Sequence, residues 1–216
     1  MTRFVLQLLD FFAQYARQCL LALGTLLLTL FLAYSYQEYQ VQQTQRASLA
    51  YHHLTQSAES TAADYQAFID GQPQTIFTTF AWMKLAKMQA STHDFSAADH
   101  ALTQALSQVS DTKLRALLML RQAKLSLLAD KPQQAIDRLK MIDSRELAFV
   151  RDLTKIDAYI GLHDLDQAQT LADKLQETQS QLQPSSSQQD FVLQQMLTAK
   201  HQRLQTLLTA RSAHKK

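Results

Sequence analysis

The chain has 216 residues, and its 21 lysines and arginines nearly balance its 19 aspartates and glutamates. This overall balance gives no indication of a nucleic-acid partner or of an acidic substrate. The single cysteine, Cys19, excludes a disulfide framework. Only three glycines and three prolines interrupt a chain rich in Ala, Leu and Gln, so we predict an all-α fold with helix nearly throughout.

An apolar stretch near the N-terminus, from Cys19 to Tyr36, contains no charged residue. As a helix it would be about 27 Å long, which is close to the hydrocarbon thickness of a bilayer. We therefore predict a transmembrane helix over residues 18–36 that contacts membrane lipid. The stretch is longer than the usual signal-peptide core of about 7–15 residues. This length favours an uncleaved anchor over a signal peptide cleaved after Ala33-Tyr34-Ser35.

The first residues, 1–17, alternate apolar and polar side chains at helical spacing, which predicts a cytoplasmic amphipathic segment at the membrane interface. Arg3 and Arg17 precede the predicted span, whereas Glu38 and then Arg46 follow it. By the positive-inside rule, the N-terminus remains in the cytoplasm and the rest of the chain is translocated.

Residues 37–78 are predicted to form a linker and the first helices of the periplasmic domain. Ser60 or Thr61 is suited to cap a short helix. That helix is predicted to stop at the turn signal around Gly71 and Pro73.

A repeat of about 34 residues follows. Ala86 and Ala98 are twelve residues apart in the first unit, as are Ala123 and Ala135 in the second, and Ala168 marks a weaker third unit. Alanines at these positions let two antiparallel helices approach closely. We therefore predict three tetratricopeptide-like repeats over residues 79–178, which stack with their neighbouring helices into a right-handed array.

Several residues fit the ends of the repeat helices. Asp94 and Asp164 are suited to cap second helices, and Pro132 is suited to a first helical turn. After a loop rich in Gln and Ser around Pro184, the apolar spacing predicts a C-terminal capping helix over residues 188–210.

No catalytic or cofactor motif is present in the sequence, because it has neither a phosphate-binding glycine loop nor a G-x-S-x-G or paired-cysteine motif. His52 and His53 are adjacent and point to different helix faces. His93 and His163 occupy equivalent turn positions in two repeats, which indicates a structural role. We predict a protein that is not an enzyme and that uses no metal, cofactor or small-molecule substrate.

A binding surface is predicted on the first helix of each repeat, which lines the concave side of such arrays. Two explanations of its apolar lining stay open. Either the last helix or the linker helix packs there, or the surface accepts an apolar partner segment with Lys87 and Lys124 at its rim. The predicted positions are Phe80, Met83, Lys87, Leu117, Leu120, Lys124, Val150, Leu153 and Asp157.

Four stretches carry a resemblance to one family. Residues 46–51 read R-A-S-L-A-Y just after the predicted span, Leu85 and Ala86 precede the first turn, residues 111–116 read D-T-K-L-R-A, and residues 120–123 read L-R-Q-A. With them, the sequence resembles the ancillary subunits of the bacterial SecYEG translocon, single-span proteins with a periplasmic tetratricopeptide-like domain.

This resemblance implies a single-pass protein of the bacterial inner membrane that sits beside the SecYEG translocon. It also implies a non-enzymatic role in passing secreted polypeptides to periplasmic chaperones, notably a membrane-anchored parvulin-like partner. The family has no catalytic residues to carry over. A membrane-tethered scaffold for envelope assembly or signalling is the alternative.

Overall fold

The computed structural model describes the backbone of residues 2–57, 59–181 and 188–214. It describes the side chains of residues 20–21, 23–57, 59–178 and 192–211. Within these ranges the fold is helical and has no strand, as predicted. The helices are α1 (Thr2–Gln56), α2 (Ala62–Gly71), α3 (Ile76–Ser91), α4 (Phe95–Ser107), α5 (Thr112–Leu128), α6 (Pro132–Lys140), α7 (Ala148–Gly161), α8 (Leu165–Gln181) and α9 (Gln188–His214).

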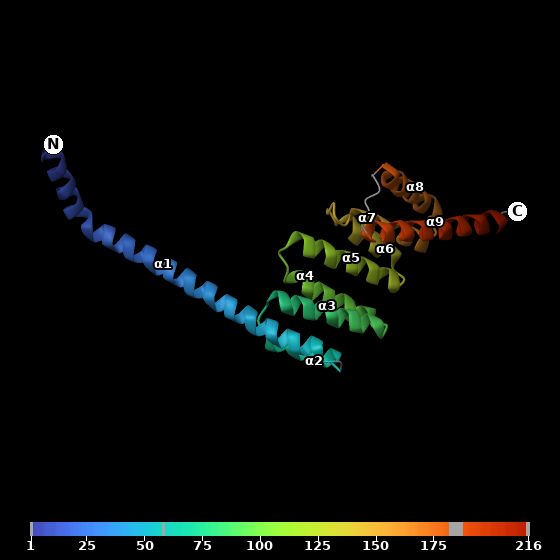
Figure 1. Ribbon diagram of the computed structural model, residues 1–216, viewed down its shortest axis with the longest axis horizontal. Coiled ribbons are helices and arrows are strands. Elements are labelled where there is room, and N and C mark those ends of the chain that lie inside the picture. The colour runs from blue at the N-terminus through green and yellow to red at the C-terminus, as the bar shows by residue number, and fades with distance from the viewer. Residues whose placement is uncertain (1, 58, 182–187, 215–216) are drawn as a thin grey trace.

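Helix α1 is unbroken over 55 residues and extends away from the other helices (Figure 1). No break divides it at the predicted boundaries after residues 17 and 36. The predicted amphipathic segment, residues 1–17, and the start of the predicted span lie outside the described side chains. Among the residues whose placement is described, no helix combines the length and hydropathy needed to cross a membrane.

The C-terminal part of α1 joins α2 and α3 in one packed unit. Ala47 is fully buried, and the ring of Tyr51 lies 5.9 Å from the rings of both Phe68 in α2 and Phe77 in α3. The R-A-S-L-A-Y stretch therefore supplies the packing residues by which the long helix joins the array. Thr61 caps α2, because its hydroxyl accepts a hydrogen bond from the Asp64 amide and the Asp64 carboxylate accepts one from the Thr61 amide.

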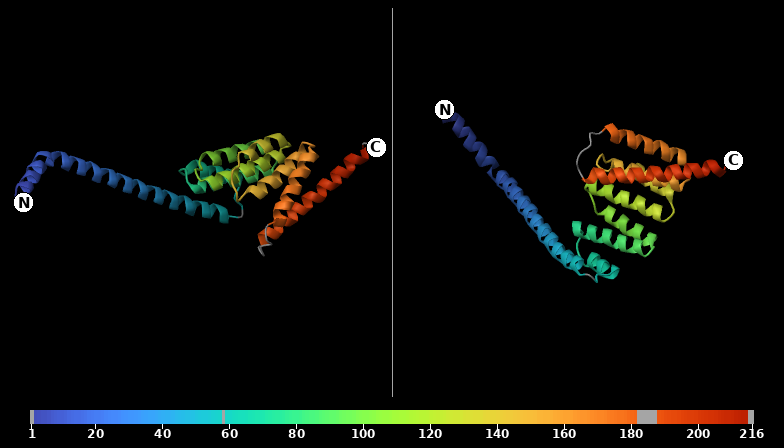
Figure 2. Two further views of the ribbon diagram at one scale, coloured as in Figure 1. Left: turned by 90° about the horizontal axis from the view of Figure 1, so that it is seen from above. Right: turned by 45° about the vertical axis from the view of Figure 1, so that its right-hand side comes forward.

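Three antiparallel helix pairs follow, α3 with α4, α5 with α6 and α7 with α8. The second helix of each pair also packs on the next helix of the chain, so α4 contacts α5, α6 contacts α7 and α8 contacts α9. The first helices, α3, α5 and α7, form one layer, and the second helices form the other (Figures 1 and 2). This is the nearest-neighbour stacking of a helical repeat protein.

The alanines that define the repeat lie where the paired helices meet. Ala98, Ala123, Ala135 and Ala168 are fully buried, and Ala86 is 3% exposed. A larger side chain at these positions would force the helices apart, because packed interiors leave little free volume. The spacing of small residues in the sequence therefore reports the contact between helices.

The three pairs turn in the same way without glycine. His93, Asp130 and His163 have φ angles of 62°, 55° and 58°. The residue after each donates its backbone N–H to a carbonyl oxygen five residues earlier, at 2.9 Å from Asp94 to Gln89, 2.8 Å from Lys131 to Ser126 and 2.9 Å from Asp164 to Tyr159. These are Schellman motifs, which normally use glycine in the left-handed position.

The predicted helix starts are confirmed. The carboxylate of Asp94 accepts the Ala97 amide at 3.0 Å, that of Asp164 accepts the Gln167 amide at 3.2 Å, and Pro132 begins α6. Helix α8 runs to Gln181, three residues beyond the predicted end of the repeats at residue 178. The loop residues 182–187 lie outside the described part of the chain.

Candidate partner-binding face

The first helices of the first two repeats carry matching surface stripes. Positions four and seven residues apart share one side of a helix. Phe80, Lys84 and Lys87 form such a stripe on α3. Leu117, Arg121, Lys124 and Leu128 form the corresponding stripe on α5, offset by 37 residues. We call the surface made by these two stripes the first-helix face.

Three of the predicted binding residues belong to the core instead of the surface. Met83 is 8% exposed and packs among buried residues that include Leu118 and Leu125. Leu120 and Leu153 are 4% and 2% exposed and belong to the next two core clusters. These side chains hold the repeats together and offer almost no area to a partner.

Three others are half-buried. The ring of Phe80 lies 6.3 Å from the rings of both Tyr51 in α1 and Phe77 in α3. Val150 packs against the second core cluster, and Leu117 lies at the edge of the first-helix face. Burial also raises the pKa of Tyr51, and the neighbouring hydroxyl of Tyr65 raises it further.

The exposed predicted residues, Lys87 and Lys124, have two neighbours that the sequence analysis missed. Lys84 and Arg121 are also exposed, each three residues before one of the predicted lysines. Leu128 is 65% exposed and extends the stripe on α5. The repeat offset of 37 residues links Lys84 to Arg121 as it links Lys87 to Lys124, so this signal was available in the sequence.

Two of the chain's own helices pack on first helices of the array. Helix α1 packs on α3, and α9 packs on α7 and α8, with Leu197 and Leu204 in the same buried cluster as Leu153. The left view of Figure 2 shows α1 and α9 on the same side of the array. Helix α1 therefore contacts the first helix of the first repeat, and α9 contacts that of the third repeat.

The contact between α9 and α7 includes an ion pair at position 157. Asp157 occupies in the third repeat the place of Lys87 and Lys124, and Lys200 of α9 forms an ion pair with its carboxylate. Leu197 and Leu204 flank Lys200 along α9 and are 4% and 0% exposed. A charged residue between two buried leucines on α9 thus packs on the stripe of α7 that contains Asp157.

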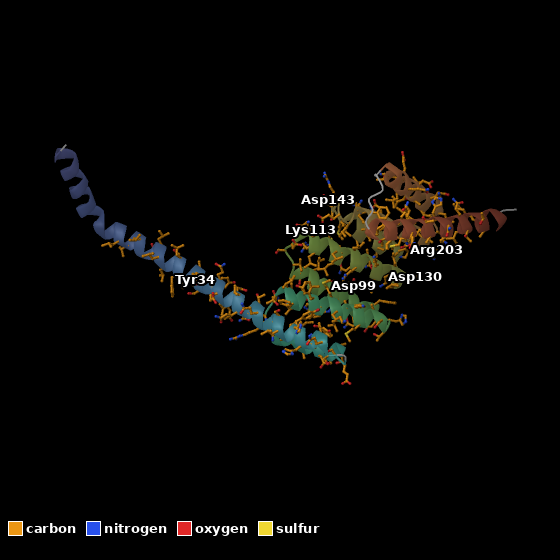
Figure 3. The ribbon with its side chains drawn as sticks, viewed as in Figure 1. Tyr34, Asp99, Lys113, Asp130, Asp143 and Arg203 are labelled. Atoms are coloured by element: carbon orange, nitrogen blue, oxygen red, sulfur yellow. The ribbon has the colours of Figure 1, made fainter. Side chains whose placement is uncertain are left out.

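A larger pocket of about 700 Å³ lies between the end of α7, the α5–α6 turn and α9. Asp130 and Arg203, both labelled in Figure 3, belong to its lining. Asp157 and Arg211 form ion pairs with Lys200 and Asp166. The pocket therefore mixes both charges. Its lining is Asp130, Asp157, Ile160, Gly161, His163, Leu165, Arg203, Leu207 and Arg211.

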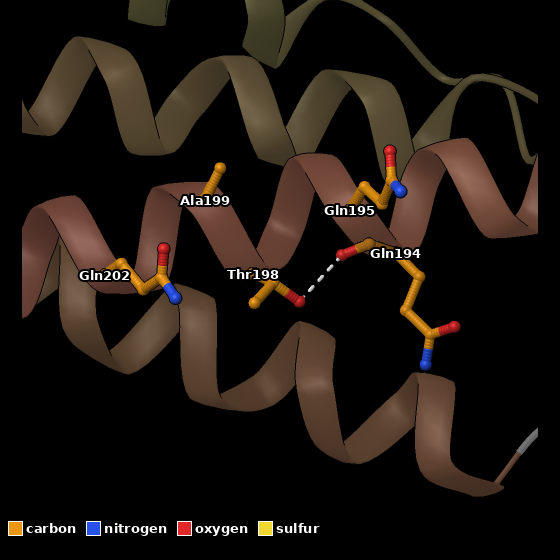
Figure 4. A pocket seen from close by; sticks show the side chains of 5 residues that line it. All are labelled: Gln194, Gln195, Thr198, Ala199 and Gln202. Atoms are coloured by element: carbon orange, nitrogen blue, oxygen red, sulfur yellow. Dashed lines mark hydrogen bonds between the residues drawn. The ribbon is translucent and has the colours of Figure 1, made fainter.

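A smaller pocket of about 340 Å³ runs along α9. Figure 4 shows its lining, in which the hydroxyl of Thr198 donates to the carbonyl oxygen of Gln194 at 2.9 Å. The lining has no titratable or nucleophilic group, because it consists of Gln194, Gln195, Thr198, Ala199 and Gln202. Amides and one hydroxyl can bind polar groups but cannot carry acid, base or nucleophilic chemistry at neutral pH.

Arg138 connects the first two repeats. Its guanidinium donates to the Asp99 carboxylate at 2.8 Å, to the Gln122 carbonyl oxygen at 3.0 Å and to the Ser126 hydroxyl at 2.7 Å. The side chain is 15% exposed. One cation on α6 thus joins α5 to α4, across the contact between the first two repeats.

The described side chains include no group of three His, Cys, Asp or Glu residues that could hold a metal ion. What they do offer is an exposed face on a rigid stack of helix pairs. Helix pairs that contact only their neighbours define a helical-repeat protein.

Comparison with known proteins agrees with this class. The model of the tetratricopeptide repeat-like domain family matches residues 10–209. The chain therefore belongs to the tetratricopeptide repeat-like domain family.

Two relatives carry the name ancillary SecYEG translocon subunit. The protein from Haemophilus influenzae is 25% identical over 151 residues, which cover 68% of this chain and 74% of the relative. The protein from Aggregatibacter actinomycetemcomitans is 24% identical over 146 residues, which cover 66% and 72%. The resemblance seen in the sequence is confirmed by these matches. No solved structure matches the chain.

Proposed function

We propose that this protein is a non-enzymatic adaptor that associates with the SecYEG translocon and helps to pass secreted polypeptides to periplasmic chaperones. The observation that carries the proposal is a rigid helical-repeat array built directly on the end of one long helix. The names of the two relatives support the association with the translocon. The chaperone, by the family resemblance, is a membrane-anchored parvulin-like protein.

Residues 18–36 of α1 anchor the protein in the bacterial inner membrane in this proposal. Support comes from the described side chains, because Leu20, Leu23, Leu27 and Leu30 are between 54% and 68% exposed although they are apolar. A helix that is apolar on all sides and exposed at its described side chains is suited to lipid. The N-terminus lies in the cytoplasm and the array in the periplasm.

The anchor gives the array its function by confining it to the surface of the membrane. Confinement raises the effective concentration of the array near the exit of the channel, so weak contacts with a partner are sufficient. The first-helix face then offers an extended surface for contacts that form and break quickly.

The experiment is purification of the intact protein in mild detergent from its native membranes, followed by identification of the copurifying proteins. The proposal predicts recovery of SecYEG subunits and a parvulin-like chaperone. Their recovery should be lost when residues 1–36 are replaced by a cleavable signal. Recovery of envelope-assembly or signalling components without the translocon would overturn the proposal and favour a membrane-tethered scaffold.

A further inference from the structure

Lys84, Lys87, Arg121 and Lys124 form a two-by-two cluster of cations on the first-helix face. Each helix contributes two of them, three residues apart, which places neighbouring Cβ atoms about 5–6 Å from each other. The two helices belong to successive repeats, and both pack on α4. A bound segment that runs from one first helix to the next would meet two cations on each.

These cations have no carboxylate of their own helices to neutralise them. Helices α3 and α5 contain six lysines and arginines and no aspartate or glutamate. In the described part of the chain, none of the four cluster residues takes part in an ion pair or side-chain hydrogen bond. The overall charge of +2 thus conceals a strongly basic face.

The third repeat shows what such a position recognises. Asp157 takes the place of Lys87 and Lys124, and it pairs with a cation, Lys200, on the helix that packs there. Because the charge is reversed in the first two repeats, the complementary group is a carboxylate. Leu117 and the exposed Leu128 lie on the same stripe as two of the cations, so a segment that binds there also needs apolar side chains to contact them.

From this geometry we infer that the first-helix face binds an acidic amphipathic helix of a partner polypeptide. The bound helix places Glu or Asp against the four cations and Leu-like side chains beside Leu117 and Leu128. The inference deepens the proposed adaptor role and rests on it, because it names the chemistry of the segment that the adaptor binds. An anionic membrane is a poorer occupant, since α1 packs on α3 and α9 packs on α7, the first helix that follows α5 in the array.

The test uses the full chain in nanodiscs of zwitterionic lipid and a fluorescent peptide with the repeated pattern Leu-x-x-Glu-x-x-x-Leu. Matched peptides carry Gln or Lys in place of Glu. We expect the Glu peptide to bind at least 10-fold more tightly than the Gln peptide, and the Lys peptide not to bind. Raising the salt concentration from 50 to 300 mM should reduce the preference for Glu, because exposed charges are screened.

The double variant Arg121→Gln/Lys124→Gln should weaken binding of the Glu peptide at least 10-fold and leave that of the Gln peptide unchanged. Its control is Arg145→Gln/Lys174→Gln, which removes two exposed cations elsewhere and should change binding less than twofold. All four substituted side chains are exposed, so both variants should fold, which circular dichroism checks.

Equal affinity for the Glu and Gln peptides would overturn the inference, as would equal losses in the two double variants. Displacement of the Glu peptide by phosphatidylglycerol vesicles, but not by phosphatidylcholine vesicles, would assign the face to lipid instead. The proposed function is tested separately by copurification. Translocon recovery without a preference for the acidic peptide would overturn only this inference.

Discussion

Leu204 tests whether α9 is held to the array by its apolar side. Its side chain is fully buried among residues that include Leu153, Ile156 and Leu197. Leu204→Ala removes three buried carbon atoms, which accounts for about 2.4 kcal/mol at 0.8 kcal/mol each. The cavity left behind adds to this loss, and we expect a total of about 3 kcal/mol. Since 1.4 kcal/mol is a factor of ten, the amides of α9 should lose protection by roughly 150-fold.

Hydrogen–deuterium exchange of the full chain measures this loss helix by helix. Each repeat contacts only its neighbours, so exchange should accelerate in α7, α8 and α9 and stay unchanged in α3 and α4. Met196→Ala is the control on the same helix, because Met196 is 42% exposed and its loss should change protection little. Equal acceleration in α3 and α9, or none in α9, would refute the reasoning.

Three further predictions concern stability, and each is measured by urea unfolding. Asp130→Gly should stabilise the protein by about 0.5–1 kcal/mol, because glycine accepts φ 55° without strain, whereas Asp130→Val should destabilise it. Arg138→Gln should cost about 1–3 kcal/mol, and Arg138→Lys should recover only part, since Lys cannot reach all three acceptors. Burial would raise the pKa of Asp152, but its hydrogen bond from Arg151 and the charge of Lys155 bring it below 3.8. The stabilisation by this carboxylate is therefore present above about pH 4 and lost as the pH falls through the lower folded pKa. Asp152→Asn should be less stable than wild type at pH 7 and equally stable in strong acid. A stability difference that does not change with pH would contradict this.

The sequence predicts the repeat well where one residue type has one physical purpose. Buried alanines are needed at close helix contacts, and Asp94 and Asp164 are needed as caps, so the chain contains them at regular spacing. The left-handed turns are different, because positions 93 and 163 are histidines and not the glycines that usually indicate a positive φ. Equivalent positions in two repeats indicate a structural role, but they do not reveal which backbone conformation the role requires.

The candidate face is harder to predict because its charge and its accessibility depend on the fold. The net charge of the whole chain hides the basic face, because α3 and α5 contain lysines and arginines but no carboxylates. Helix periodicity alone does not show that α9 packs on α7, because the partner of an apolar helix face depends on the tertiary fold. Periodicity also does not separate Met83 and Leu120, which join core clusters, from Lys87 and Lys124 on the surface.

Because α1 continues without a break into the array, its length sets the direction in which the array faces. Residues between the predicted span and Ala47, the first fully buried residue among the described side chains, form a continuous helical stem. One residue inserted there would turn the whole array by about 100° and raise it by about 1.5 Å, whereas seven would raise it by about 10 Å and restore its heading to within about 20°. The distance of the array from the predicted span and the direction in which the array faces are thus two separate quantities, and the number of residues in a single helix sets both.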